Sequence, residues 1–520
     1  MRRLQDLPSW APISISGVHK HTQRDLNFIM GEPSFSPLTP DTMHPVPAEV
    51  LDNVFRLLED DRLSLSACSR VSRDIWFPFA SQRLFRSLKF HAVVGGSYNR
   101  ASSVSFRDFL AFVESCDRAS TCTYNLVLDG SWTPRHQANY MAPIVVCRLG
   151  VDLLSDIVVA LPALRTLELS SVQFTLPGLM FKFPETPFTL DRLILDYTMA
   201  HPLAQPDGRP GFNVSSILPI FSSLGKLVVR YGVQSDFAFD PMSVYGLNYA
   251  CFSTRISDLE LKLTRHDDVI HFLDAMVETL APASLLNLRL FVNGWWYPGM
   301  LAHLLMFLSS PASRNLQTLY LHWGRGVSFT NIIVSDGALL TEDEQVKMAI
   351  SPSEPLFPTL GTTTQVSSLF FTQTIAEKKS AVISNTFAAT ISTLLSTDPS
   401  RQQPLSTSCL RKAHLKFIFG QRFSAKDMPG VLARLPWDEL DRVVEALKWS
   451  GPGYSEVLTH PSPPEGQGIE VYLGVVGEHL PNDIFIQAQD AIRSQVSMRT
   501  RRLLRIVSLN NVTQSSSVRK

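Results

Sequence analysis

Apolar residues recur at helical spacing in a segment that begins at residue 44, HPVPAEVLDNVFRLLEDDRLSLSACSRVSRDIWFPFASQRLFRSLKF. Pro47 fits the first turn of a helix, and Glu49 and Asp52 complement the positive end of its dipole. A first helix is therefore predicted to start near Pro47 and to end at the EDDR that follows. Its apolar positions form a stripe wider than one packing seam needs: Val50, Leu51, Val54, Phe55, Leu57 and Leu58.

Two further short helices are predicted in the same segment. Pro78 is expected to end the second helix before a third, ASQRLFRSL. The second helix would carry four apolar residues on one face: Leu65, Cys68, Val71 and Ile75. Three such helices in about 45 residues hold more apolar surface than they can bury among themselves. The pattern does not decide what buries the remaining apolar surface. It could be another protein, or it could be the following domain, in which case the helices would cap that domain.

A second hydrophobic pattern begins after about residue 120 and repeats. It is clearest in LPALRTLELSSVQF, where leucines at 161, 164, 167 and 169 fit L-x-x-L-x-x-L-x-L. Related copies follow roughly 26 to 34 residues apart, near the period of leucine-rich repeats. They are TLDRLILDYT, FSSLGKLVVRY, RISDLELKLT, SLLNLRLFVN and NLQTLYLHW, and less regular later strands are predicted at VSSLFFTQ, LRKAHLKFIFG, IEVYLGV and RLLRIVSL.

The repeat predicts an α/β fold with a parallel sheet. L-x-L places two leucines on one face of a short strand, and stacked neighbours bury what one unit cannot. Helix-like segments alternate with the strands, as in VDLLSDIVVALPA, VIHFLDAMVETLAPA and PGMLAHLLMFLSSPA. We expect an irregular, curved leucine-rich-repeat-like solenoid over residues 91–509, a small helical domain over 45–90, and flexible ends at 1–44 and 510–520. An ordinary doubly wound α/β domain is the alternative, because buried parallel strands also read as aliphatic runs.

Composition narrows the class of partner and compartment. The 520 residues are 45% hydrophobic and carry 47 basic and 47 acidic side chains, which gives no bulk electrostatic reason for a nucleic-acid or membrane partner. The six cysteines show no paired CxxC spacing and indicate reduced thiols. No signal peptide is recognised, and the most apolar run, GMLAHLLMFL, is about half a membrane span. We expect a cytoplasmic or nuclear protein.

No catalytic motif or cofactor site is found in the sequence. It lacks the phosphate-binding loop, the dinucleotide fingerprint, the HExxH zinc motif and the GxSxG elbow. The acidic cluster at 59–61 is interpreted as a turn between helices. His266 and His271, with Asp267 and Asp268 between them, lack a third convergent ligand, so no metal site is predicted.

Two aromatic clusters near strand ends are the predicted substrate contacts, if they are exposed. Aromatic residues and arginine are typical anchors of interfaces, although large rings could equally fill gaps between irregular repeats. The candidates are Trp295, Trp296, Tyr297, Tyr320, His322, Trp323 and Arg325.

The segment at 45–90 resembles the F-box, particularly in its fungal form. The resemblance rests on Val46-Pro47-x-Glu49-Val50-Leu51, on the later ACSRVSR and LFRSL, and on Asp61, Leu63 and Leu65; tryptophan stands at 76, one position after its usual place. It implies docking on the Skp-type adaptor of a cullin-RING ubiquitin ligase, while the solenoid recruits a protein substrate. The predicted docking residues are Pro47, Val50, Leu51, Val54, Phe55, Leu58, Leu63 and Leu65.

The chain is thus predicted to be a non-catalytic substrate receptor without a cofactor. The assembled ligase would supply the chemistry by raising the effective concentration of substrate lysines. The alternative is a ligase-independent scaffold whose F-box-like helices cap the solenoid. Exposure of the first helix would favour docking, and burial of Leu51 and Phe55 within the chain would favour the scaffold.

Overall fold

The computed structural model describes residues 47–58, 61–72, 75–92, 105–130, 147–175, 187–196, 199–200, 214–230, 254–263, 266–292, 295–296, 298–324, 326–327, 366–375, 387, 411–420, 423–446, 468–476 and 479–509. The predicted flexible ends lie outside these residues. The chain divides into two compact units, Met1–Val54 and Phe55–Lys520.

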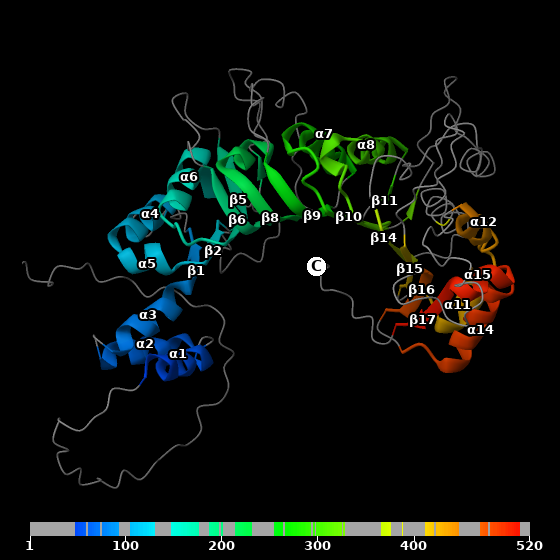
Figure 1. The fold of residues 1–520 in the computed structure, drawn as a ribbon, viewed down its shortest axis with the longest axis horizontal. Helices are drawn as coiled ribbons and strands as arrows, with labels where there is room; N and C mark the ends of the chain where they lie inside the picture. Colours follow the sequence, from blue (N-terminus) through cyan, green and yellow to red (C-terminus); the bar gives the residue numbers. More distant parts are fainter. Residues whose placement is uncertain are drawn as a thin grey trace, which may run out of the picture. The chain divides into compact units, whose positions relative to one another are not determined.

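The main element of the second unit is a 12-stranded sheet in which every neighbouring pair is parallel (Figure 1). Its strands are β1 (Ser87–His91), β2 (Asn125–Asp129), β4 (Thr166–Ser170), β6 (Phe188–Asp196), β8 (Phe221–Arg230), β9 (Arg255–Leu263), β10 (Asn287–Val292), β12 (Thr318–His322), β14 (Ser368–Ile375), β15 (Lys412–Phe419), β16 (Gly468–Val475) and β17 (Leu504–Ser508). They pair in the order in which they occur along the chain. The predicted α/β class with a parallel sheet is confirmed.

Two small parallel sheets accompany the large one. The first contains β3 (Cys147–Gly150), β5 (Val172–Thr175) and β7 (Met199–Ala200), and the second contains β11 (Trp295–Trp296) and β13 (Gly326–Val327). Except for β3, each of these strands begins within four residues of the end of a strand of the large sheet.

Helices cover one face of the large sheet. The first group is α4 (Phe106–Ser115), α5 (Asp117–Cys122), α6 (Val151–Val159), α7 (His266–Thr279) and α8 (Pro298–Leu308), and the later group is α11 (Met428–Leu432), α12 (Glu439–Ala446), α14 (Asn482–Arg493) and α15 (Met498–Leu503). Figure 1 shows α6, α7 and α8 on the same side of the strands, and between β8 and β15 no described helix lies on the other side. The sheet therefore has a covered face and a helix-free face.

The core lies between the sheet and these helices. The leucines of the predicted repeats point to the covered face, and successive strands place them in two continuous rows, as at Leu259 with Leu261 and Leu319 with Leu321, all nearly without exposed surface. Because alternate residues of a strand face opposite ways, the residue between each pair of leucines points to the helix-free face.

Three helices precede the sheet: α1 (Ala48–Leu57), α2 (Arg62–Val71) and α3 (Trp76–Arg86). The first begins and ends where predicted. The second ends at Val71, so Ile75 is not part of it, and the third begins at Trp76 rather than after Pro78. Pro78 falls in the first turn of α3, where the missing N–H costs no helical hydrogen bond. The end of the predicted third helix is also wrong, because Ser87 and Leu88 belong to β1.

Candidate functional site

The helices α1 and α2 expose large apolar side chains. Leu57 is 85% exposed and Leu63 is 78% exposed, although both are leucines in helices. Spacings of four and three place the exposed residues of α1 on one face of that helix. The exposed apolar residues of α1 and α2 are Val50, Val54, Leu57, Leu63 and Val71, and Ile75 between α2 and α3 is exposed as well.

The eight predicted docking residues fall into two groups. Pro47, Val50, Val54 and Leu63 are exposed, and Leu58 is half-buried. The other three, Leu51, Phe55 and Leu65, are buried. The exposed group has surface to offer a partner, whereas the buried group stabilises the helices themselves.

Phe55 is the central ring of the helical segment that contains α3. Its ring meets Trp76 edge-on at 6.0 Å between centroids and stacks on Phe79 at 6.2 Å. Both partner rings lie in α3, so these two ring contacts bury Phe55 against a neighbouring helix and not against the large sheet. Such aromatic pairs add to the free energy of burial.

The predicted acidic turn at 59–61 includes the cap of α2. Asp61 Oδ1 accepts a hydrogen bond from the backbone N–H of Ser64 at 3.1 Å, and Ser64 Oγ donates to Asp61 Oδ2. These bonds from Ser64 lower the pKa of the Asp61 carboxyl, so it remains ionised as the cap. Glu59 and Asp60 lie outside the described residues.

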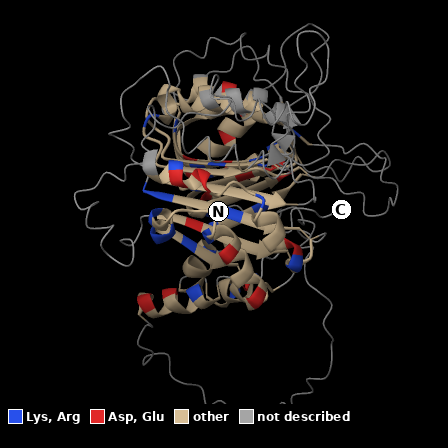
Figure 2. Ribbon diagram, turned by 90° about the vertical axis from the view of Figure 1, so that its right-hand side faces the viewer, with Lys and Arg blue, Asp and Glu red and all other residues tan. Residues whose placement is uncertain are grey.

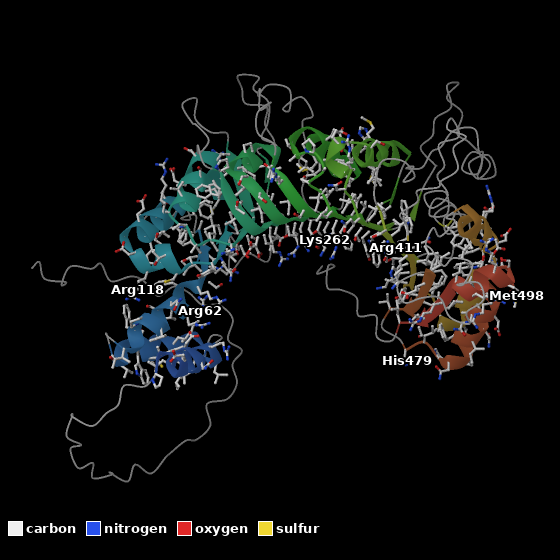
Figure 3. The ribbon with its side chains drawn as sticks, viewed as in Figure 1. Arg62, Arg118, Lys262, Arg411, His479 and Met498 are labelled. Atoms are coloured by element: carbon white, nitrogen blue, oxygen red, sulfur yellow. The ribbon has the colours of Figure 1, made fainter. Side chains whose placement is uncertain are left out.

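The helix-free face of the sheet carries polar and aromatic side chains in continuous rows. The strand register places the central residues of seven strands side by side, in the order Glu260, Arg289, Tyr320, Phe370, His414, Glu470 and Arg505. Lys262 lies on the side of the sheet away from α7 and α8 (Figure 3). Basic and acidic residues both occur along the strands (Figure 2).

Five rings form an aromatic ladder across this face, one from each of β10, β12, β14, β15 and β16. Successive ring centroids are 4.9, 6.1, 4.2 and 5.7 Å apart. At the β9 end, Lys262 Nζ lies 5.2 Å from the first ring, a cation–π contact. The aromatic ladder consists of Phe291, Tyr320, Phe370, His414 and Tyr472.

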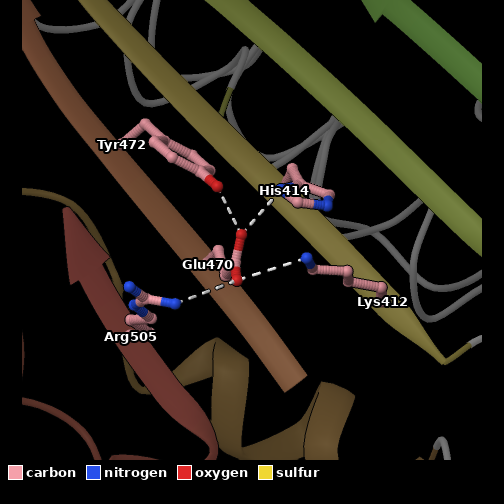
Figure 4. Close-up of polar contacts among 5 residues, drawn as sticks. All are labelled: Lys412, His414, Glu470, Tyr472 and Arg505. Carbon is pink, nitrogen blue, oxygen red and sulfur yellow. Dashed lines mark hydrogen bonds and ion pairs between the residues drawn. The ribbon is translucent and has the colours of Figure 1, made fainter. Parts of the chain in front are cut away.

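At the far end of the ladder, Glu470 receives four polar groups (Figure 4). Lys412 Nζ lies 3.3 Å and His414 Nδ1 3.1 Å from its carboxylate, Arg505 is at 3.9 Å, and the hydroxyl of Tyr472 donates a short hydrogen bond. Burial alone would raise the pKa of the Glu470 carboxyl, but the bonds from Tyr472 and Lys412 and the neighbouring charges outweigh it, and the pKa falls. The carboxylate is thus fully ionised at neutral pH.

The two ring residues beside Glu470 stay neutral. Burial, together with the positive charge of Lys412, lowers the pKa of His414 to about 4 despite the nearby carboxylate. A neutral imidazole can face a carboxylate oxygen only if that nitrogen carries the proton, so His414 Nδ1 donates to Glu470. Burial and the bond to Glu470 raise the pKa of Tyr472 to about 12.

Glu260 makes a matching cluster at the other end of the ladder. It is held between Lys226 Nζ at 2.6 Å and Lys262 Nζ at 2.8 Å. Burial would raise the pKa of this carboxyl, yet the two lysine bonds outweigh burial and lower it to about 2. Both glutamates on this part of the face are therefore already neutralised by the chain's own cations.

The predicted substrate contacts are only partly brought together. Tyr320 and His322 lie half-buried on the helix-free face, where Tyr320 Oη is 2.7 Å from Thr372 Oγ1 and His322 Nε2 is 3.2 Å from Thr374 Oγ1. Burial, and then the charge of Lys416, lowers the pKa of His322 to about 4. Both side chains are thus only half-exposed on the sheet surface and are already bonded to threonines of β14.

The other predicted contacts differ. Trp323 is fully buried and stacks on Phe371 at 5.8 Å, so it fills the core and has no surface for a partner. Trp295 and Trp296 form β11, and Tyr297 and Arg325 lie outside the described residues. Phe291, Phe370, His414 and Tyr472 were not predicted; the alternation of residues along each strand could have placed each one on the helix-free face, but not beside the others.

No group of metal-binding residues occurs among the side chains that the structure describes. His266 and His271 both lie in α7, but their side chains are outside that set. Among the residues that the structure describes, no helix is both long and apolar enough to cross a bilayer. No protein-family model matches the sequence, and comparison with curated proteins gives no match.

Proposed function

We propose that this chain is the substrate-recruiting subunit of a Skp-cullin-F-box ubiquitin ligase. In this proposal the F-box comprises α1, α2 and α3 and docks on the Skp-type adaptor. The observation that carries it is the exposure of apolar side chains on α1 and α2, in a segment whose residue order resembles an F-box. Exposed apolar surface of this kind marks an interaction site.

We further propose that the parallel sheet and its helices form an irregular leucine-rich-repeat-like solenoid that holds a protein substrate. Strand order that follows chain order supports a repeat architecture over a doubly wound domain, in which the order reverses. The receptor itself would perform no chemistry; it would hold substrate lysines close to the conjugating enzyme of the ligase.

A ligase-independent scaffold is the second candidate, and specific contacts favour it. The helix α3 runs directly into β1, Arg118 lies over the ring of Phe77 at 4.8 Å and bonds Ser81, and Thr123 Oγ1 donates to the carbonyl of Phe85. Together with buried Leu51 and Phe55, these contacts suit a cap. A capping role would account for these contacts of α3. It would not account for the exposed apolar residues of α1 and α2, and adaptor docking is therefore preferred.

The test is co-purification of the full chain with a purified Skp-type adaptor. The variant combines Val50→Asp with Leu63→Asp, because both side chains are exposed and their loss leaves the core intact. Each apolar side chain buried on docking stabilises a complex by about 1.5–3 kcal/mol, so affinity should fall at least tenfold. Phe55 is unsuitable for this test, since its substitution would damage the core.

A matched control adds the same charge without removing apolar surface. It combines Asn53→Asp with Arg70→Gln, both exposed polar positions on the same two helices. The proposal expects the control to bind the adaptor like the wild type. If the wild type does not bind, or if the control loses as much affinity as the test variant, adaptor docking by this surface is rejected and the capped scaffold becomes the better account.

A further inference from the structure

The helix-free face between β9 and β17 has more basic than acidic side chains. The acidic ones are already occupied: Glu260 by two lysines, Glu470 by its cluster, and Asp258 by a hydrogen bond from Asn287 Nδ2. The basic residues on this part of the face are Lys262, Arg289, Lys412, Lys416 and Arg505. The surplus positive charge is thus not cancelled within the described face.

Two of these cations, Arg289 and Lys416, form no ion pair or side-chain hydrogen bond with any described residue. Lys416 is half-buried in the register row between Thr372 and Tyr472, and burial lowers the pKa of its ammonium group. Removing an ammonium group from water without a counter-charge is unfavourable, so an incoming anion would gain most at this position. Arg289 is exposed on the neighbouring row, beside Tyr320.

The aromatic ladder lies in line with these cations. Its rings are half-buried rather than fully packed, apart from His414, so their remaining surface faces the open side of the sheet. Stacked rings offer flat, apolar surface that accepts another aromatic or aliphatic side chain at low entropic cost. The helix-free face therefore offers unpaired cations for a negatively charged group and aromatic rings for an apolar group of the same ligand.

We propose that the helix-free face from β9 to β17 binds an extended acidic polypeptide segment that also carries aromatic side chains. Carboxylates would pair with Lys416 and Arg289, and an aromatic side chain would stack on the ladder near Phe370. A nucleic acid fits less well, because its affinity comes from many phosphate contacts, whereas only Lys416 and Arg289 among the described cations of this face lack a counter-charge. That this face binds such a segment does not depend on the proposed function. That the segment belongs to a ligase substrate rests on the proposed function.

The test measures binding of a fluorescent random copolymer of glutamate and tyrosine to the full chain by anisotropy, without any adaptor. Polyglutamate and a lysine–tyrosine copolymer of the same length serve as comparison polymers. The proposal expects the glutamate–tyrosine copolymer to bind most tightly, polyglutamate more weakly and the lysine–tyrosine copolymer not measurably. A single-stranded oligonucleotide of equal charge should compete poorly; competition at equal concentration would instead identify a general polyanion surface and overturn the proposal.

Variants place the site on the sheet. Lys416→Met should weaken binding about tenfold, since it removes a charge-assisted contact at a half-buried position. Arg289→Gln should weaken it about threefold, as expected for an exposed contact. Phe370→Leu should reduce the preference for the glutamate–tyrosine copolymer over polyglutamate towards unity.

Two control variants remove a cation elsewhere. Lys89→Met lies on β1, at the other end of the sheet, and Arg434→Gln is exposed just after α11. Both should bind the copolymer like the wild type, and the thermal unfolding of every variant is measured alongside. Absence of binding by the wild type, or equal losses in test and control variants that remain folded, would overturn the proposal. Neither result concerns adaptor binding, so the proposed docking by α1 and α2 is judged separately.

Discussion

The imidazole of His414 stacks on the phenyl ring of Phe370 in the neighbouring strand, with centroids 4.2 Å apart and planes inclined by only 8°. The stack holds a neutral histidine against the ionised carboxylate of Glu470, and the same imidazole also contacts the ring of Tyr472. A group that titrates near neutrality in water is thereby fixed in its uncharged form within the sheet.

This relationship predicts acid sensitivity of the fold. The pKa of His414 is about 4 in the folded chain and 6.5 ordinarily, so the unfolded state binds more protons between these values. Stability is therefore fully present above pH 6.5 and is lost as the pH falls towards 4, by up to about 3 kcal/mol for this histidine. Denaturant unfolding at pH 7, 5.5 and 4.5 should show a smaller loss for His414→Phe than for the wild type. Parallel losses in the two proteins would contradict the assignment.

Removal of the Glu260 charge should destabilise the sheet. Lys226 and Lys262 lie 2.6 and 2.8 Å from this carboxylate, and Glu260→Gln would leave both ammonium groups close together without their counter-charge. The expected loss in free energy of unfolding is about 1–3 kcal/mol. Lys226→Met combined with Glu260→Gln should recover part of the loss, because only one lysine then remains. Urea unfolding of the single and double variants measures this, and an unchanged Glu260→Gln protein would refute it.

Phe55 and Leu57 should respond oppositely to truncation although they are two residues apart in α1. Phe55 is 1% exposed and packs on two rings of α3, so Phe55→Ala should cost about 3–5 kcal/mol within the helical segment. Leu57 is 85% exposed, and Leu57→Ala should change stability by less than about 0.5 kcal/mol. Hydrogen exchange of α3 amides reports the local effect. Similar exchange in the two variants would mean that Phe55 is not a core residue.

A side chain at Gly468, the first residue of β16, is expected to destabilise the fold. Its φ is +128°, and a Cβ there would lie 2.8 Å from the carbonyl oxygen of Leu503. Gly468→Ala should therefore lower the free energy of unfolding by about 1–3 kcal/mol. Gly430 in α11 is the matched control, because a Cβ there meets nothing within 4 Å and alanine favours the helix by up to about 1 kcal/mol. Calorimetry of the two alanine variants should show shifts of opposite sign.

The strands could be predicted because the leucine pairs have a period of two and stand between helical segments of a different period. Every predicted repeat segment overlaps a strand of the large sheet, including the less regular ones near β14 to β17. The start of α3 was missed because Pro78 was interpreted as a break, whereas the position of proline within a helix decides whether it is tolerated. β1 was missed because SLKFH follows a helix without any turn residue.

The candidate surfaces were harder to predict because they depend on neighbours that are distant in sequence. Trp323 was predicted as a substrate contact because it belongs to an aromatic cluster near a strand end. Packing of the folded chain decides whether such a residue is exposed, and Trp323 is fully buried. The ladder residues Phe291, Phe370 and Tyr472 are single aromatics in separate strands, and only the register places them side by side. Segments of very different length separate these strands, so the sequence alone does not give that register.

The pairing of strands in chain order has a consequence for how this protein can change in evolution. Each interior strand of the large sheet bonds only to the strand before it and the strand after it, so no distant partner must be preserved when the middle of the chain is altered. Duplication or deletion of one strand with its helix would leave two compatible edges that can pair again. The length of the helix-free face can then change in whole steps, while the helices at the amino-terminal end keep their sequence.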